Sequence, residues 1–309
     1  SRDIEQLEYL LSKKVLGQEL QQYVTDFALP EFQRVLEVGQ TQFAGNSQQY
    51  PLLEYKSEFR SYFSLYKRAL HLHPGDSVSG GALRARDFEA LERDFLQKEH
   101  RCSVIDDFLS DDALRQIQDF LLESTFWLDP KRGYVGTYLH TGFASPLTAQ
   151  IDFEIRSKFP GVLDGLELQN AWAFMFDGDM GGVNTHADDA QVQINIFLTP
   201  TEANLWSENN EGPSGGLIIF GIGPPEEWAF THFNSEGDKP HIEQLIASTG
   251  NWNLTVPYVQ NRAILFDSTY FHRTNDMKFK KGYTNRRINM TFLYGKRAKL
   301  SAAPTQRAA

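Results

Sequence analysis

Three side chains in this sequence have the types and spacing to bind a metal ion. His186 and Asp188 are separated by one residue, and a second histidine, His272, follows a later apolar segment. Residues two apart in an extended segment point to the same side, because a strand has a period of two. Two imidazoles and one carboxylate on one face of a metal leave its other positions open, and this ligand set suits Fe(II). The pattern therefore predicts an Fe(II) site at His186, Asp188 and His272.

Alternating segments near these residues predict the strands that position them. Residues 191–197 alternate between polar and apolar side chains directly after the first two ligands, which indicates a half-buried strand. Residues 287–294 also alternate, and this places Arg287, Asn289 and Thr291 on one face of a strand. The forked, permanently charged guanidinium of arginine matches a carboxylate. Arg287 therefore predicts that an anionic ligand binds beside the metal.

With H-x-D, a distal histidine and an arginine on the next strand, the sequence resembles the Fe(II)/2-oxoglutarate-dependent oxygenases, and among them the prolyl-4-hydroxylase-like branch. The resemblance covers residues 103–295, including the segments 104–109 and 215–220. It implies Fe(2+) bound by the three predicted ligands, with 2-oxoglutarate and O2 as co-substrates. It also implies that Arg287 binds the distal carboxylate of 2-oxoglutarate, with Asn289 and Thr291 beside it.

Some positions depart from that pattern or offer an alternative to it. Many hydroxylases of this branch have a tyrosine ten residues before the first ligand, where this chain has Phe176, which can pack against the co-substrate but cannot donate to it. Arg286 competes with Arg287 for the carboxylate, but strand alternation and the R-x-N-x-T spacing favour Arg287. Asp189 competes with Asp188, but a shift of one residue would point it away from the metal. An aspartate at this position favours hydroxylation over halogenation.

The chain from residue 166 onward predicts an α+β fold with a double-stranded β-helix (jelly-roll) core, because short strands alternate there with Gly- and Pro-rich turns. Strands are expected at 171–176, 192–198, 215–220, 254–258, 263–266 and 288–294. Helices that begin near Ser110 and Pro146 are expected to buttress one sheet. The polar insertion 201–214 and the aromatic insertion 224–252 interrupt the strands, and the second is predicted to form a folded lid over the substrate.

The first hundred residues have helical periodicity. A helix from Phe59 is expected to end in Tyr66–Pro74, which resembles the second helix of a tetratricopeptide repeat, although no second copy is present. Residues 75–81 are rich in Gly and Ser and are expected to form a linker. The predicted organisation is an α-helical N-terminal region at 1–100, an oxygenase domain at 101–298 and a flexible tail at 299–309.

Composition and charge restrict the partners. The chain has 309 residues, enough for a full core, and a net charge of −10. Such acidity disfavours phosphate backbones, so no nucleic-acid partner is expected, and the basic stretch 278–287 is expected to be a solvated connection. No apolar stretch is long enough to cross a bilayer, so no membrane partner is expected either. The sequence indicates no oligomeric state.

The single cysteine, Cys102, is expected to be a buried apolar residue and fits a reducing compartment, so we expect a cytoplasmic protein. The polar, acidic beginning lacks a signal-peptide pattern, and Ser1 in place of methionine suggests a trimmed chain. The remaining histidines lack ligand spacing and are expected at the surface. They are His71, His73, His100, His140, His232 and His241.

These features predict a dioxygenase that hydroxylates a peptide or protein side chain, or an amino-acid-like small molecule, with release of succinate and CO2. Two alternatives stay open. An AlkB-type oxidative nucleic-acid demethylase would share R-x-N-x-T, but its closing arginine is replaced here by Leu293. A non-catalytic helical interaction module with an inert barrel would neither bind iron nor form succinate.

Overall fold

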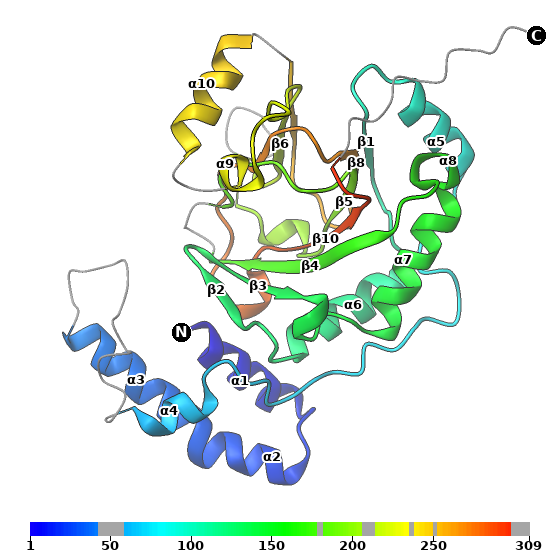
Figure 1. The fold of residues 1–309 in the computed structure, drawn as a ribbon. Helices are drawn as coiled ribbons and strands as arrows, with labels where there is room; N and C mark the ends of the chain where they lie inside the picture. Colours follow the sequence, from blue (N-terminus) through cyan, green and yellow to red (C-terminus); the bar gives the residue numbers. More distant parts are fainter. Residues whose placement is uncertain (43–58, 178–181, 206–213, 235–237, 250–251, 298–309) are drawn as a thin grey trace, which may run out of the picture.

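The core of this computed structural model is a seven-stranded antiparallel sheet (Figure 1). The structure describes residues 1–42, 59–177, 182–205, 214–234, 238–249 and 252–297. In spatial order the strands are β1 Cys102–Ile105, β8 Ala263–Asp267, β5 Val192–Phe197, β10 Ile288–Tyr294, β4 Leu168–Phe176, β3 Tyr134–Tyr138 and β2 Asp129–Lys131. The predicted strands at 171–176, 192–198, 263–266 and 288–294 are thereby confirmed to within a few residues.

A second sheet faces the first. Its strands are β7 Asn253–Val256, β6 Leu217–Phe220 and β9 His272–Thr274, in that spatial order. Leu217, Ile219 and Val256 of this sheet form one buried cluster with Phe197 and Phe266 of the larger sheet. Two facing antiparallel sheets with helices on one outer face form the double-stranded β-helix core of the predicted α+β fold.

Helices cover the outer face of the large sheet, as predicted. They are α5 Phe88–Gln97, α6 Asp111–Glu123, α7 Pro146–Lys158 and α8 Pro160–Leu163. The Oγ of Ser110 accepts a hydrogen bond from the backbone N–H of Ala113 and caps α6, and Ser145 caps α7 with Pro146 in its first turn. Apolar side chains that alternate along each central strand pack under these helices. The intervening side chains therefore point into the space between the two sheets.

The N-terminal helices form a small core of their own. They are α1 Arg2–Lys13, α2 Gln18–Tyr23, the π-helical turn η1 Val24–Ala28, α3 Leu29–Gln42 and α4 Arg60–Leu65. Leu7, Leu10 and Val24 are buried among them. Helix α1 also contacts the rest of the protein, because Gln6 Nε2 donates to the carbonyl of Ser124 at 2.8 Å. The predicted division at residue 100 stays a prediction.

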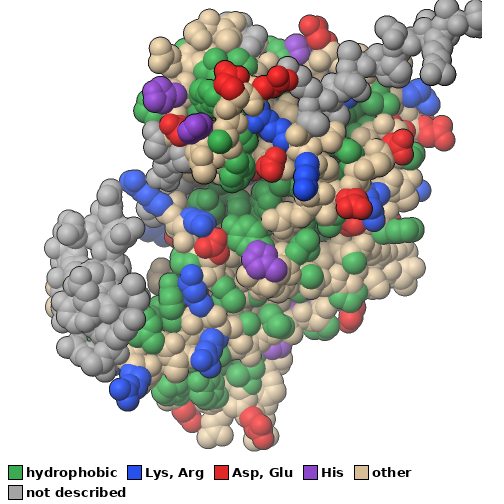
Figure 2. All heavy atoms as spheres, viewed as in Figure 1, with side chains coloured by type: hydrophobic (Ala, Val, Ile, Leu, Met, Phe, Trp, Pro, Cys, Tyr) green, Lys and Arg blue, Asp and Glu red, His purple; other side chains and the backbone are tan. Residues whose placement is uncertain are grey.

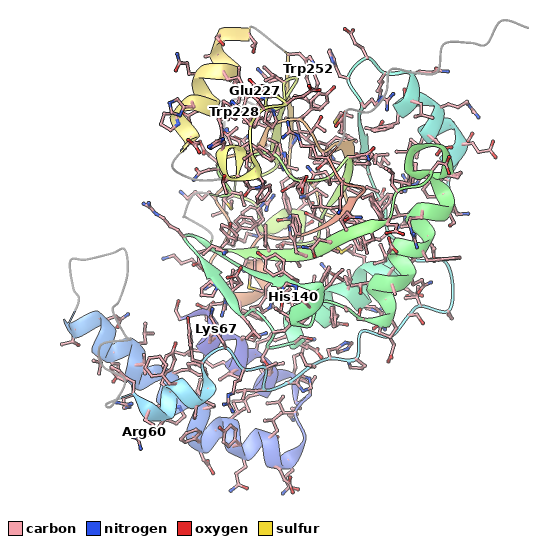
Figure 3. The ribbon with its side chains drawn as sticks, viewed as in Figure 1. Arg60, Lys67, His140, Glu227, Trp228 and Trp252 are labelled. Carbon is pink, nitrogen blue, oxygen red and sulfur yellow. The ribbon has the colours of Figure 1, made fainter. Side chains whose placement is uncertain are left out.

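The expected helix over Tyr66–Pro74 is wrong. Helix α4 ends at Leu65, and Lys67 has a left-handed φ of 57°. Beyond Lys67 the chain is extended (Figure 3). Thr125 holds this segment by backbone pairing with His71 at 2.8 Å, and its Oγ1 accepts from the N–H of Leu70 at 2.7 Å. Hydrogen bonds to the sheet domain replace those of a helix, so the resemblance to a tetratricopeptide repeat fails.

Residues 75–81 do not form a free linker. The carbonyl of Gly75 accepts from Leu147 at 2.9 Å, and the N–H of Val78 donates to Gln150 at 2.9 Å. Further on, Glu154 accepts from the N–H groups of Ala82 and Leu83. Polar side chains of α7 therefore bind residues 75–83. The Gly- and Ser-rich composition of this segment did not indicate these contacts.

The aromatic insertion is folded, as predicted, and contains α9 Phe230–Phe233 and α10 Lys239–Thr249. Phe233 and Ile242 are buried against Ala187 and Phe271. In the polar insertion 201–214, residues 206–213 lie outside the described part of the chain, as does the predicted tail. Among the described residues no helix is both long and apolar enough to span a membrane.

Candidate metal centre

The two predicted histidine ligands lie directly opposite each other on adjacent segments. The N–H of His186 donates to the carbonyl of His272 at 3.0 Å, and the reverse bond measures 2.8 Å. The two rings are 4.4 Å apart between centroids. His272 follows the apolar segment 262–266, as the sequence indicated, and it is also the first residue of β9 in the small sheet. A chain reversal between β8 and β9 carries it across to the opposite sheet.

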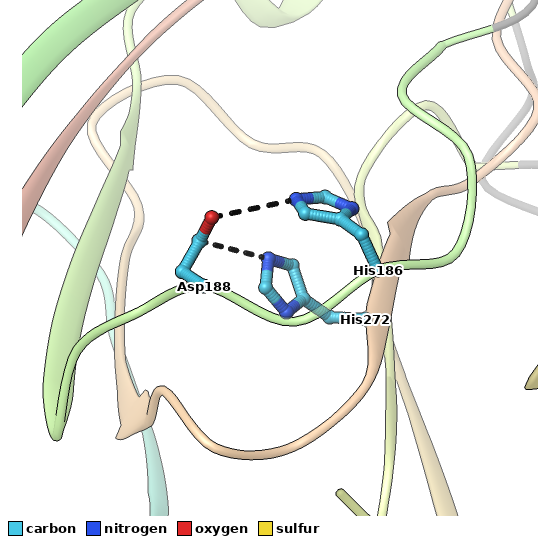
Figure 4. Close-up of side chains that lie close together, drawn as sticks. All are labelled: His186, Asp188 and His272. Atoms are coloured by element: carbon cyan, nitrogen blue, oxygen red, sulfur yellow. Dashed lines mark ion pairs between the residues drawn. The ribbon is translucent and has the colours of Figure 1, made fainter. Parts of the chain in front are cut away.

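Asp188 completes a compact cluster with the two histidines (Figure 4). Its Oδ1 lies 3.8 Å from Nε2 of His186, and its Oδ2 lies 3.4 Å from Nε2 of His272. All three ligand atoms fall within 4.8 Å of one another. Metal bonds to nitrogen and oxygen of about 2.0–2.2 Å would span such separations with small side-chain movements. Asp189 is exposed and takes no part in the cluster.

Backbone carbonyls orient both imidazoles toward this point. Nδ1 of His186 lies 2.7 Å from the carbonyl of Asn184, and Nδ1 of His272 lies 3.1 Å from that of Tyr270. A carbonyl only accepts, so each Nδ1 carries the proton and each Nε2 presents a lone pair to the cluster. Such second partners fix ligand tautomers in metal sites.

Electrostatics keep the ligands in the forms that bind a cation. Burial, and next the neighbouring His272, lower the pKa of His186 to about 4, so its imidazole is neutral at neutral pH. Burial favours a raised pKa for Asp188, but the adjacent imidazoles of His272 and His186 outweigh it and the pKa is lowered. The Asp188 carboxylate and the neutral His186 imidazole are therefore in the protonation states that bind a metal ion.

The aromatic insertion holds the backbone between the first two ligands. The N–H of Ala187 donates to the carbonyl of Phe233 at 3.2 Å, and the carbonyl of Ala187 accepts from Nδ2 of Asn234 at 2.9 Å. Both polar groups of the residue between His186 and Asp188 are thereby fixed. No sequence pattern indicated these two hydrogen bonds, because Ala187 and its partners Phe233 and Asn234 are far apart in the chain.

Asn234→Ala is expected to weaken metal binding about tenfold, the lower end of the effect of losing an outer partner of a metal site. The freed Ala187 carbonyl allows the two ligands to move relative to each other. Titration of metal-free protein with Fe(II) under nitrogen measures the affinity. His232→Ala, on an exposed residue of α9 two positions before Asn234, is the control and should bind as tightly as the unchanged chain. Unchanged affinity in Asn234→Ala would show that the hydrogen bond from Ala187 to the Phe233 carbonyl is enough to fix the backbone between the two ligands.

Arg287 is buried without an acidic partner. Its side chain is 1% exposed, and no described carboxylate lies within ion-pair distance of it. Nε donates to the carbonyl of Gly215 at 2.7 Å and Nη1 to Oδ1 of Asn289 at 2.8 Å. The guanidinium carbon lies 4.6 Å from the ring centre of Phe176 and 5.5 Å from that of Tyr258.

This environment suits a ligand anion. Burial lowers the pKa of Arg287 to about 10, so the group stays charged at neutral pH. A buried charge with no counter-ion destabilises the folded protein by several kcal/mol, about as much as the loss of one partner from a buried ion pair. A bound carboxylate would relieve that cost with charge-assisted hydrogen bonds.

Arg286, the alternative to Arg287, is occupied elsewhere. It forms ion pairs with Glu5 of α1 at 3.0 Å and with Asp177. Its side chain points away from the space between the sheets, as alternation along β10 requires. The geometry thus favours Arg287.

The other predicted residues lie where the alternation placed them. Asn289 and Thr291 point inward from β10 and line the same small cavity as Phe176, Arg287 and the three ligands. Thr291 Oγ1 accepts from Nδ2 of Asn195 at 2.9 Å, across the β10–β5 pair.

Two inward residues of β5 were missed. Gln193 lies 3.3 Å from Nε2 of His272, and Asn195 has a buried Oδ1 without a partner among the described residues. The period-two pattern of residues 191–197 places both side chains on the same face as Phe197, so this alternation was sufficient to predict that they point inward.

Two connected cavities contain this site. The inner one, of about 30 Å³, lies between the ligands and Arg287. The outer one, of about 810 Å³, opens from His186 and Asp188 toward the surface. Trp172, Phe174 and Val183 line both, so a molecule in the outer cavity would lie beside a metal on the ligands.

Of the remaining histidines, His140, His232 and His241 are exposed, as expected; Figure 3 shows His140 just beyond β3. His71, His73 and His100 are instead partly buried. Nδ1 of His73 accepts from the N–H of Gly75 at 3.1 Å, and His100 packs 4.1 Å from Trp252. These packing contacts, not a ligand role, account for their burial. Cys102 is buried, as predicted.

No family model matches this chain, and no curated protein matches it. Among solved structures it is similar to a prolyl-4-hydroxylase from Pseudomonas putida, at 16% identity and a TM-score of 0.43, over 68% of this chain and 100% of that one. It is also similar to HygX from Streptomyces hygroscopicus, solved with nickel and 2-oxoglutarate, at 14% identity and a TM-score of 0.44, over 69% of this chain and 87% of that one. A third similar structure is the non-haem α-ketoglutarate-dependent carbocyclase SnoK from nogalamycin biosynthesis, at 10% identity and a TM-score of 0.46, over 73% of this chain and 94% of that one. At these values a functional assignment has to rest on the site itself.

Proposed function

We propose that this chain is an Fe(II)- and 2-oxoglutarate-dependent dioxygenase that hydroxylates its substrate. One observation carries the proposal: a His-Asp-His cluster lines the same small cavity as a buried arginine that has no carboxylate partner among the described residues. The cluster alone would fit several divalent metals. The arginine adds the requirement for an anionic ligand within reach of the metal, and a 2-oxo dicarboxylate satisfies both ends.

In this proposal the residues have separate tasks. His186, Asp188 and His272 would hold Fe(II). Arg287, supported by Asn289, binds the distal carboxylate of 2-oxoglutarate. Iron with 2-oxoglutarate and O2 supplies the oxidation, in which one oxygen atom converts a substrate C–H to C–OH and the other enters succinate as CO2 leaves.

Phe176, Phe197 and Tyr258 surround the Arg287 guanidinium and exclude water from its bond to the co-substrate. Phe176 contributes packing where a tyrosine would donate, so Arg287 and Asn289 carry more of the co-substrate's binding energy. The hydroxylated molecule is a small molecule or a peptide side chain that reaches the metal through the outer cavity.

Succinate release tests the proposal without a known substrate. Metal-free protein is loaded with Fe(II) under nitrogen, given 2-oxoglutarate and exposed to O2. Slow succinate formation that needs both Fe(II) and O2 is the expected result. Absence of both iron binding and succinate would overturn the proposal and favour a non-catalytic interaction protein.

A further inference from the structure

The floor of the outer cavity is aromatic. Tyr134 and Tyr138 of β3 and Trp172 and Phe174 of β4 line it. The rings of Trp172 and Phe174 are stacked at 5.7 Å, and Tyr134 lies 5.0 Å from Phe174. Phe230 of α9 lines the cavity as well and is 50% exposed. Flat rings of this kind bind another flat ring by stacking, which contributes about 0.5–1.5 kcal/mol per pair beyond the buried area.

A glycine in β3 makes this floor continuous. Gly136 lies between Tyr134 and Tyr138 on the strand, opposite Phe174 of β4. A Cβ at Gly136 would lie 3.0 Å from Cε1 of Phe174, which is tighter than ordinary contact. The missing side chain therefore lets the Phe174 ring extend over β3, a role often found for glycine inside a strand.

The rim of the same cavity is cationic. Lys131 at the end of β2, Arg132 in the turn that follows and Lys239 at the start of α10 line it. Among the described residues, the one carboxylate that lines it belongs to the proposed metal ligand Asp188. Figure 2 shows Lys and Arg side chains along one edge of the hollow on this face. The chain as a whole has 40 acidic and 30 basic residues, so the cavity has the opposite sign. A cleft lined by one sign of charge concentrates ligands of the other.

Of these three cations, Lys239 and Arg132 are available to a ligand. The third, Lys131, forms an ion pair with Asp129 at 3.1 Å. Lys239 Nζ donates to Oδ1 of Asn184 at 3.2 Å and lies only 3.9 Å from Glu243. That exposed pair is worth about 0–1 kcal/mol, so it does not neutralise Lys239 toward a ligand. Arg132 has no ion pair with any described residue.

We propose that the outer cavity binds a small aromatic acid as the substrate. Its ring lies on the floor of Tyr134, Tyr138, Trp172 and Phe174, and its anionic group meets Arg132 and Lys239. The proposal names the substrate class of the same site and rests on the proposed function for the oxidation step. The outer cavity has a volume of about 810 Å³, within the range of about 300–1,000 Å³ for sites that bind small molecules. The net charge of −10 opposes a polyanion such as a nucleic acid, which contacts a wider surface.

Binding to the metal-free full chain tests this proposal. The probes are 2-naphthoate, an aromatic acid, and 2-naphthamide, which has the same rings without the charge; calorimetry at low salt measures both. We expect naphthoate to bind about tenfold more tightly, with a difference that shrinks as salt is added. Neutralising the rim in the double variant Arg132→Gln, Lys239→Gln should remove the difference. Trp172→Leu should weaken both probes.

The double variant Lys278→Gln, Lys280→Gln is the matched control, because it removes two exposed cations that do not line the cavity. It should bind both probes as the unchanged chain does. Equal binding of the two probes, no binding of either, or unaltered naphthoate binding after the rim is neutralised would overturn the proposal. Tighter binding of a single-stranded oligonucleotide, lost with Arg132 and Lys239, would overturn it in favour of nucleic acid. Since no metal is present, failure here is distinct from failure of iron binding or succinate release.

Discussion

Asp188→Ala is expected to lower Fe(II)-dependent succinate formation at least about 100-fold, because losing even an outer partner of a metal ligand costs about 10- to 100-fold. Asp188 is the one carboxylate of the cluster, and its two oxygens lie 3.8 Å and 3.4 Å from the Nε2 atoms of His186 and His272. Without it, only the two imidazoles of the cluster remain to hold a dication. Succinate assays and the iron bound per chain measure the loss.

Asp189→Ala is the matched control for that substitution. It removes the same chemical group one residue further on, where the side chain is exposed and outside the cluster. Iron content and succinate formation should stay close to those of the unchanged chain. Equal activity of Asp188→Ala and Asp189→Ala would mean that the cluster does not bind the metal.

Arg287→Met is expected to raise the 2-oxoglutarate concentration needed for half-maximal succinate formation about 100-fold, since hydrogen bonds to charged groups contribute about 1.5–3 kcal/mol each. Methionine keeps an apolar stem between the rings of Phe176 and Phe197, so the space stays filled. Fe(II) affinity should be retained, because the three metal ligands are untouched. A titration with 2-oxoglutarate and a separate one with Fe(II) distinguish the two effects.

Arg286→Gln provides the comparison. It breaks the ion pairs with Glu5 and Asp177, which lie outside the cavity. We expect a small loss of stability and an unchanged 2-oxoglutarate requirement. If Arg286→Gln raised that requirement and Arg287→Met did not, the carboxylate would bind at Arg286.

The sequence by itself was enough to predict the candidate ligands and which of two adjacent residues faces the space between the sheets. His186 and Asp188 share a side because they are two apart, and Arg287 points inward with Asn289 and Thr291 for the same reason. The central strands were predictable because one face of each packs under helices and the other lines a polar site, which leaves a strict alternation in the sequence. Such a local periodicity needs no knowledge of the partner strands.

Tertiary structure decided what depends on contacts between distant segments. Three such features are the position of His272 in the second sheet, the hydrogen bond from Asn234 to the Ala187 carbonyl, and the binding of residues 66–83 to the sheet domain. In each of them at least one partner in every hydrogen bond is a backbone N–H or C=O group. Backbone groups are the same in every residue, so sequence patterns do not reveal which of them pair. The aromatic floor and cationic rim likewise come from β3, β4, the β2–β3 turn and α10, and only the folded chain brings these together.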